Sequence, residues 1–154
     1  MPFSQLLTAD RIVLLVEPGD RDGVLDAAAR LLTDSAPGTT AAIGDSLRSR
    51  ERLGSTAIGH GIAIPHGRTQ AFTEARGAFL RLQQPVDFAA SDGEPVDLVF
   101  AMAVPEHFTQ QHLQLLSELA ERFADPAFRV ALRAAPDVTS LRRLMLDAMD
   151  PQPA

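Results

Sequence analysis

Residues 54–68 read GSTAIGHGIAIPHGR and combine a short apolar run with several glycines and a proline. The run Ile62-Ala63-Ile64 is typical of a buried strand, and Pro65 fixes φ and lacks a backbone donor. Glycines on both sides leave room for a partner's backbone or a phosphate to come close. We therefore expect a strand over residues 58–64 that ends in a rigid turn, with the imidazole of His66 presented where the backbone leaves the sheet.

Apolar periodicity and turn residues predict alternating strands and helices on both sides of this segment. Further strands are expected over 12–16, 76–82 and 97–104, the last two joined through 85–88 and a turn at 91–94. Helices are expected over 24–32, from a cap at Thr39 or Thr40 to about 53, from a cap at Thr109 with Leu113, Leu116, Ala120 and Phe123 on one face, over 127–134 and over 137–149. This alternation implies one α/β domain whose sheet is covered on both faces.

The composition is that of an ordinary globular protein. The chain has 154 residues, 45% of them hydrophobic, and a mean hydropathy of +0.01, which suits one domain with a proper core. No apolar run approaches the roughly 20 residues that a membrane-spanning helix needs. The N-terminus lacks a basic segment and an apolar stretch of useful length, so we expect no export signal and a cytoplasmic protein.

Two missing residue types restrict the chemistry. The chain contains no cysteine, which excludes disulfides, thiolate metal sites and a cysteine nucleophile. All 14 basic residues are arginine, so a Schiff-base lysine and a P-loop lysine are excluded too. A net charge of −6 argues against nucleic acid as a partner. A nucleophile in this chain must be histidine, serine, threonine or a carboxylate.

The run Ala63-Ile64-Pro65-His66-Gly67, preceded by Gly-Ser-Thr and Gly-x-Gly, resembles the phosphohistidine signature of the fructose/mannitol-type enzyme IIA domains of the bacterial phosphotransferase system. The resemblance also includes residues 95–101, 104–105 and 111–113, and it is strongest to the nitrogen-type branch of the family. It implies a single EIIA type-2 domain over 1–154, with its core at about 6–149. The implied fold is a mixed, roughly five-stranded sheet flanked by helices on both faces.

The resemblance implies that His66 is the phosphoryl acceptor, through its tele nitrogen, and that His112 and Arg50 stabilise the phosphate. A largely neutral imidazole is a nucleophile near neutral pH, and a guanidinium binds phosphate through two parallel hydrogen bonds. His112 follows Thr109 by three residues, so it falls in the first turn of a helix, where the dipole favours anions. The alternatives are a hydrogen-bonded core His66, a solvated or capping His112 and a solvated Arg50, with Arg52 the residue most easily confused with Arg50.

Other candidates are weaker. We expect His60 on the rim of the site and His107 exposed beside the start of a helix. The four histidines lack the ligand spacing of a zinc site, so no metal and no cofactor are expected. Backbone N–H groups of Ser55 and Thr56, or of Gly67 and Arg68, are further candidates for phosphate contacts, and the residues alone do not choose between them.

Two functions are compatible with these features. The first is a phosphoryl carrier that takes phosphate on His66 from a histidine-phosphorylated small carrier protein, HPr-like or NPr-like. The second is a regulatory module whose phosphorylation state selects targets such as transporters or sensor kinases, which is what the nitrogen-type branch implies. The alternative is a sugar-specific IIA that passes phosphate to a permease IIB unit. A metal-dependent hydrolase lacks ligands, and neither nucleic-acid binding nor membrane insertion is expected.

Overall fold

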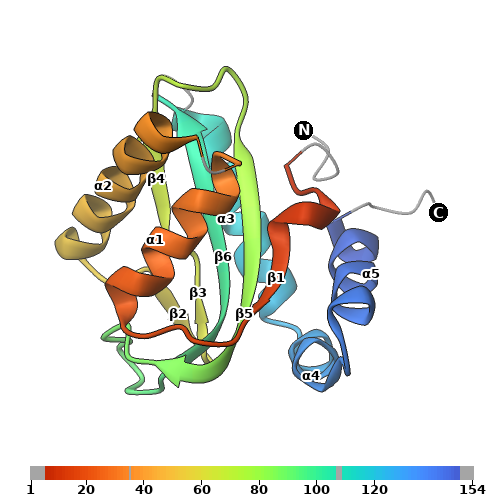
Figure 1. The fold of residues 1–154 in the computed structure, drawn as a ribbon. Helices are drawn as coiled ribbons and strands as arrows, with labels where there is room; N and C mark the ends of the chain where they lie inside the picture. The colour runs from red at the N-terminus through yellow and green to blue at the C-terminus, as the bar shows by residue number, and fades with distance from the viewer. Residues whose placement is uncertain (1–5, 35, 107–108, 150–154) are drawn as a thin grey trace.

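Strand β6 (Val96–Pro105) lies at the centre of the sheet in the computed structural model, which describes residues 6–34, 36–106 and 109–149 (Figure 1). It pairs antiparallel with β5 (Arg76–Val86) and parallel with β3 (Ile62–Ala63) and β4 (His66–Thr69). Strand β1 (Ile12–Leu15) pairs parallel with β5 at one edge, and β2 (Ala57–Gly59) pairs antiparallel with β3 at the other. The sheet order is β1-β5-β6-β3-β2, with β4 also on β6. Within the described residues the sheet is mixed and has six strands, where about five were predicted.

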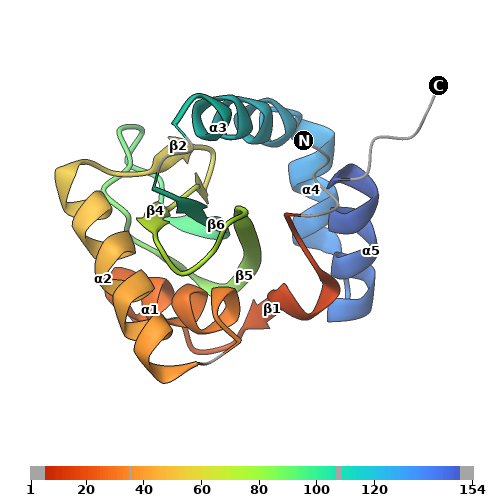
Figure 2. The ribbon, with the colours of Figure 1, turned by 90° about the horizontal axis from the view of Figure 1, so that it is seen from above.

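Helices cover both faces of this sheet. Helices α1 (Arg21–Leu32) and α2 (Pro37–Leu53) lie on one side, and α3 (Thr109–Phe123) lies on the other (Figure 2). Helix α4 (Pro126–Ala134) follows α3 and packs against α3 and α5 (Val138–Met149), and α5 packs beside β1. Side chains of β6 alternate between the two cores: one cluster contains Phe100 and Met102 with α3–α5, and the other contains Val99 and Ala101 with α1 and α2. The predicted covering of both faces is confirmed.

The strand predicted over residues 58–64 is wrong, because the chain reverses inside it. Gly59, His60 and Gly61 have φ values of +94°, +58° and +78°. Three successive residues in the left-handed region turn the chain back, which makes β2 and β3 an antiparallel hairpin. His66 is also placed differently from the prediction, since it opens β4 instead of standing where the backbone leaves the sheet.

Two helix predictions need correction. Helix α2 begins at Pro37 with Ala36 as its N-cap, so Thr39 and Thr40 lie inside its first turn, since the fixed φ of proline suits the first helical position. In α3 the buried stripe is Leu115, Leu119 and Phe123, at a spacing of four, whereas Leu113 is 67% exposed. Two element boundaries also differ from the prediction: β5 includes residues 85 and 86, and α1 begins at Arg21, after its cap Asp20. The cap at Thr109 and the position of His107 lie outside the described side chains.

Replacing Gly61 by alanine is expected to destabilise the fold more than the same change at Gly93. Both glycines have nearly equal φ values, +78° and +76°, so both variants carry the left-handed penalty of about 1–2 kcal/mol. A Cβ at Gly61 would also lie 2.6 Å from Arg133 Nη2 and 2.9 Å from Asp97 Oδ1, whereas at Gly93 nothing lies within 4 Å. Overpacking adds about 1–3 kcal/mol. Urea unfolding of both variants measures the difference, and equal losses would contradict this description of the hairpin tip.

Candidate phosphoryl-transfer site

His66 is held by the backbone two residues before it. Its Nδ1 lies 2.9 Å from the carbonyl oxygen of Ile64. A carbonyl oxygen only accepts hydrogen bonds, so Nδ1 carries the proton and Nε2 carries the lone pair. The ring is half-buried at the start of β4, where His66 pairs with Met102 of β6. This geometry gives the imidazole one tautomer and one orientation, with Nε2 as its nucleophilic atom.

The surroundings keep the ring neutral. The pKa of His66 is lowered, mainly because burial disfavours the charged imidazolium. The hydrogen bond to Ile64 and the charge of Glu51 raise the pKa, and the charges of Arg50 and Arg68 lower it. A neutral imidazole at physiological pH is the form that can act as a nucleophile.

Two pockets meet at His66. One has a volume of about 690 Å³ and the other about 320 Å³. Three residues, His66, Arg50 and Leu116, line both of them. The larger pocket is also lined by Ser46, Ser49, Leu53, Gly67, Arg68 and Leu113. Each of the two pockets beside the imidazole is therefore lined by a cationic side chain and an apolar one.

The structure brings Arg50 to His66 and leaves Arg52 outside both pockets. Arg50 stands in the last turn of α2, and its Nη1 donates a hydrogen bond of 2.8 Å to the carbonyl oxygen of Gly54. The exposed Arg52 lines neither pocket. His112 falls in the first turn of α3, the helix that supplies Leu113 and Leu116, but its side chain lies outside the described ones.

Gly67 lets α2 approach the site closely. A Cβ at Gly67 would lie 2.5 Å from Oγ of Ser46, and that hydroxyl donates a hydrogen bond of 3.0 Å to the carbonyl oxygen of Arg68. Helix α2 is thereby fixed against β4, one helical turn before Arg50. The glycine after His66 thus has a packing role that the sequence alone did not reveal.

Three comparisons place this chain among known proteins. Residues 5–148 match the family model described as "Phosphoenolpyruvate-dependent sugar phosphotransferase system, EIIA 2". The chain belongs to this EIIA family. It is 40% identical over 151 residues to a nitrogen regulatory protein of Pseudomonas aeruginosa, covering 97% of this chain and 98% of that protein.

Solved structures agree with this membership. The nitrogen regulatory protein IIA-Ntr of Neisseria meningitidis has a TM-score of 0.83 and 37% identity, covering 92% of this chain and 97% of that one. The mannitol enzyme IIA of Escherichia coli, solved in complex with phosphorylated mannitol enzyme IIB, has a TM-score of 0.73 and 20% identity, covering 92% and 99%. The second likeness concerns the fold alone. No helix in the described part of this EIIA chain is long and apolar enough to cross a membrane.

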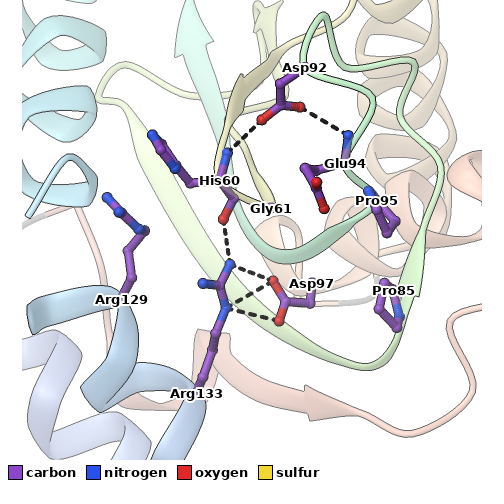
Figure 3. Close-up of a pocket in the computed structure, with 9 residues that line it drawn as sticks. All are labelled: His60, Gly61, Pro85, Asp92, Glu94, Pro95, Asp97, Arg129 and Arg133. Atoms are coloured by element: carbon purple, nitrogen blue, oxygen red, sulfur yellow. Dashed lines mark hydrogen bonds and ion pairs between the residues drawn. The ribbon is translucent and has the colours of Figure 1, made fainter. Parts of the chain in front are cut away.

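His60 does not stand on the rim of the His66 site, and that prediction is wrong. It lies at the tip of the β2–β3 hairpin near the start of β6, in a separate pocket of about 560 Å³ (Figure 3). Its N–H donates to Asp92 at 3.0 Å, and its carbonyl oxygen accepts from Arg133, which also binds Asp97 (Figure 3). His60 therefore belongs to a turn of this EIIA chain that these hydrogen bonds hold in place, and its own backbone has a left-handed φ of +58°.

Sequence reasoning gave Thr56 the wrong contact and missed Glu51 and Leu53. Thr56 was a candidate for a phosphate contact, but its N–H donates to the carboxylate of Glu51 at 2.8 Å. Glu51 itself is only 3% exposed, although it stands between two arginines in the sequence. Its burial could have been inferred from its position, because it comes eight residues after Ile43 and four after Leu47 on the buried stripe of α2. Leu53, 86% exposed beside His66, carried no signal in the sequence.

The stability of this EIIA chain is expected to fall below about pH 6.5 through His66. Because the pKa of His66 is lower in the folded chain than in the unfolded chain, the unfolded state binds a proton first as the pH decreases. The stability due to the neutral ring is complete above the unfolded pKa of about 6.5 and is lost as the pH falls through the folded pKa. Urea unfolding between pH 7.5 and 5 measures this loss. His66→Gln is the control and should show a flatter dependence; identical slopes would contradict the prediction.

Proposed function

We propose that this EIIA chain is a phosphoryl carrier that accepts phosphate on Nε2 of His66. The donor is a histidine-phosphorylated small carrier protein, HPr-like or NPr-like. In the transfer, the phosphorus–nitrogen bond on the donor histidine breaks as a new one forms to Nε2 of His66. The donor ring keeps the electron pair of the broken bond, and the proton on Nδ1 of His66 stays hydrogen-bonded to Ile64. No oxidant, metal or cofactor takes part in this exchange.

The observation that supports the proposal most is the fixed tautomer of His66 beside a cationic group. The hydrogen bond from Nδ1 to Ile64 leaves Nε2 as the nucleophile, and Arg50 lines both pockets that meet at the ring. Phosphoryl transfer depends chiefly on positioning and on charge stabilisation, which these two residues supply. Arg68, also in the larger pocket, adds a second cationic group. His112 is proposed to donate a further hydrogen bond to the phosphate, from the first turn of α3.

We propose further that the phosphorylation state of His66 controls which regulatory target the protein binds. The likeness to nitrogen regulatory proteins over 97% of the chain supports this output. Leu53 and Leu113, 86% and 67% exposed, flank the site and offer apolar surface for a transient contact. A dianionic phosphate placed between them changes both the charge and the hydration of that surface. The alternative is a sugar-specific IIA that passes phosphate to a permease IIB unit of the fructose or mannitol type.

Incubation with phosphoenolpyruvate, the first enzyme of the system and its histidine carrier tests the carrier function. The mass of the intact protein should rise by one phosphoryl group, and the bond should be labile in acid and stable in base, as expected of phosphohistidine. Adding a fructose- or mannitol-type IIB unit afterwards tests the alternative, since rapid loss of the phosphate to IIB would favour the sugar pathway. If the protein takes up no phosphate from an HPr-like or from an NPr-like carrier, the proposal is refuted.

Charge at position 66 is expected to change the set of bound targets. His66→Asp and His66→Glu imitate the phosphate charge imperfectly, whereas His66→Ala leaves the site uncharged. Targets that bind the unphosphorylated surface should be retained by His66→Ala and lost by the two acidic variants, because their interface would then bury an unpaired charge. Quantitative pull-downs with the three variants measure this. Identical sets of bound targets for all three variants would refute the regulatory function and favour the sugar-pathway carrier.

A further inference from the structure

Glu51 is a buried carboxylate that makes both of its hydrogen bonds to one residue. Its Oε2 accepts from the N–H of Thr56 at 2.8 Å, and its Oε1 accepts from Oγ1 of Thr56 at 2.7 Å. Burial of a carboxylate is costly even when it is hydrogen-bonded, and an apolar side chain would fill the same position on the buried stripe of α2 without that cost. Glu51 is only 3% exposed, so its charge and its two acceptors call for an explanation.

A continuous series of hydrogen bonds leads from Glu51 to the ring of His66. Thr56, which the carboxylate holds, accepts a hydrogen bond of 3.0 Å on its carbonyl oxygen from the N–H of Ile64. The carbonyl oxygen of Ile64 in turn accepts from Nδ1 of His66 at 2.9 Å. Two residues, Thr56 and Ile64, therefore connect the carboxylate to the group that sets the tautomer of the imidazole. Displacing Thr56 displaces the acceptor that orients His66.

The same short turn also holds the arginine of the site. Arg50 and Glu51 are consecutive in the last turn of α2, and each binds one end of the segment that leads into β2. Arg50 donates to the carbonyl oxygen of Gly54, while Glu51 accepts from Thr56. One clamp thus fixes the arginine and the histidine relative to each other.

We propose that Glu51 is a positioning residue of the phosphoryl-transfer site, acting on His66 through Thr56 and Ile64. This inference rests on the proposed function of His66. In this role Glu51 contacts neither the phosphate nor the donor. It keeps the Ile64 carbonyl oxygen within hydrogen-bond distance of Nδ1–H of His66. The ring then has one orientation before the donor binds, with Nε2 facing the incoming phosphorus. Its negative charge also opposes the charges of Arg50 and Arg68, the other described charged groups that act on the ring.

The experiment compares Glu51→Ala, Glu51→Gln and Thr56→Val with Asp45→Asn, a control that removes an exposed charge from the same helix. Phosphate transfer from the histidine carrier should slow about tenfold in Glu51→Ala and about threefold in Thr56→Val, which loses one of the two bonds. Glu51→Gln keeps an acceptor and the shape, so it should restore most of the rate. Asp45→Asn should match the wild type.

The second readout is nitrogen NMR of the unphosphorylated His66 ring. The wild type should show the Nδ1–H form at high pH, and Glu51→Ala should show a mixture of both tautomers, which a merely stabilising role would not produce. In Glu51→Gln the pKa of His66 should fall, because the charge that raises it is gone. This readout needs no phosphate donor, so a failure of the wild type to be phosphorylated would end the proposed function without deciding the role of Glu51.

Two results would overturn the inference. One is a folded Glu51→Ala protein with the wild-type transfer rate, and the other is a single, unchanged tautomer of His66 in that variant. Should Glu51→Ala fail to fold, as judged by circular dichroism, Thr56→Val decides alone. A threefold slower transfer would then support the positioning role, and the wild-type rate would refute it.

Discussion

Replacing His66 by alanine is expected to abolish phosphate incorporation from the histidine carrier. The chain has no cysteine, and the described part of the site presents no second imidazole with its tautomer fixed by a backbone carbonyl. Removing the nucleophile removes the covalent step itself, so the loss should be complete instead of partial. Intact-protein mass after incubation with phosphoenolpyruvate and the carrier system measures it directly.

His60→Ala is the matched control for this experiment. His60 belongs to the same glycine-rich segment but lies at the hairpin tip, in a different pocket from His66. The His60 variant should therefore take up one phosphoryl group as the wild type does. Labelling that survives in His66→Ala, or that is lost in His60→Ala, would contradict the assignment.

Replacing Arg50 by alanine is expected to slow phosphate transfer about ten- to a hundredfold while leaving the covalent site intact. One charge-assisted hydrogen bond to the phosphoryl group contributes about 1.5–3 kcal/mol, and about 1.4 kcal/mol corresponds to a factor of ten in rate. His112→Ala should show a similar loss, from its place in the first turn of α3. Rapid-quench kinetics with the phosphorylated carrier measure both variants.

Arg52→Ala separates a specific role of Arg50 from a general effect of helix charge. Arg52 stands two residues later on α2, is exposed and lines neither pocket at His66. Its removal takes the same charge from the same helix end, so it should change the transfer rate little. A large loss in Arg52→Ala with a small one in Arg50→Ala would mean that the wrong arginine has been placed in the site.

Much of the fold could be predicted from apolar patterns, because they are set by burial. The runs that became β1, β5 and β6 are apolar enough to specify strands, and apolar residues at helical spacing specify α1. Helices α2, α4 and α5 were predicted from turn, cap and proline residues. The hairpin of β2 and β3 was missed, since left-handed φ at a histidine between two glycines leaves no periodic signal. The face of α3 was misjudged because Leu113 is apolar and yet exposed; its position beside His66 suits contact with a partner.

The candidate site could be predicted in part. The motif around His66 was read from the sequence, and the family resemblance that it carries implied Arg50; the structure brings these two residues to the same pockets. The bond from Nδ1 to Ile64, the clamp of Glu51 on Thr56 and the approach of α2 at Gly67 could not be predicted. These contacts depend on tertiary packing between α2, the hairpin and β4, and composition and spacing do not determine such packing.

Nitrogen NMR of the phosphorylated protein, labelled with ¹⁵N in its histidines, tests the central claim most directly. Because Nδ1 of His66 carries the proton that Ile64 accepts, the phosphate should be bonded to Nε2, and phosphorus–nitrogen coupling should appear at that atom alone. The assignment to His66 follows from loss of the signal in His66→Ala. Coupling at Nδ1 of His66, or at a nitrogen of any other histidine, would contradict the account.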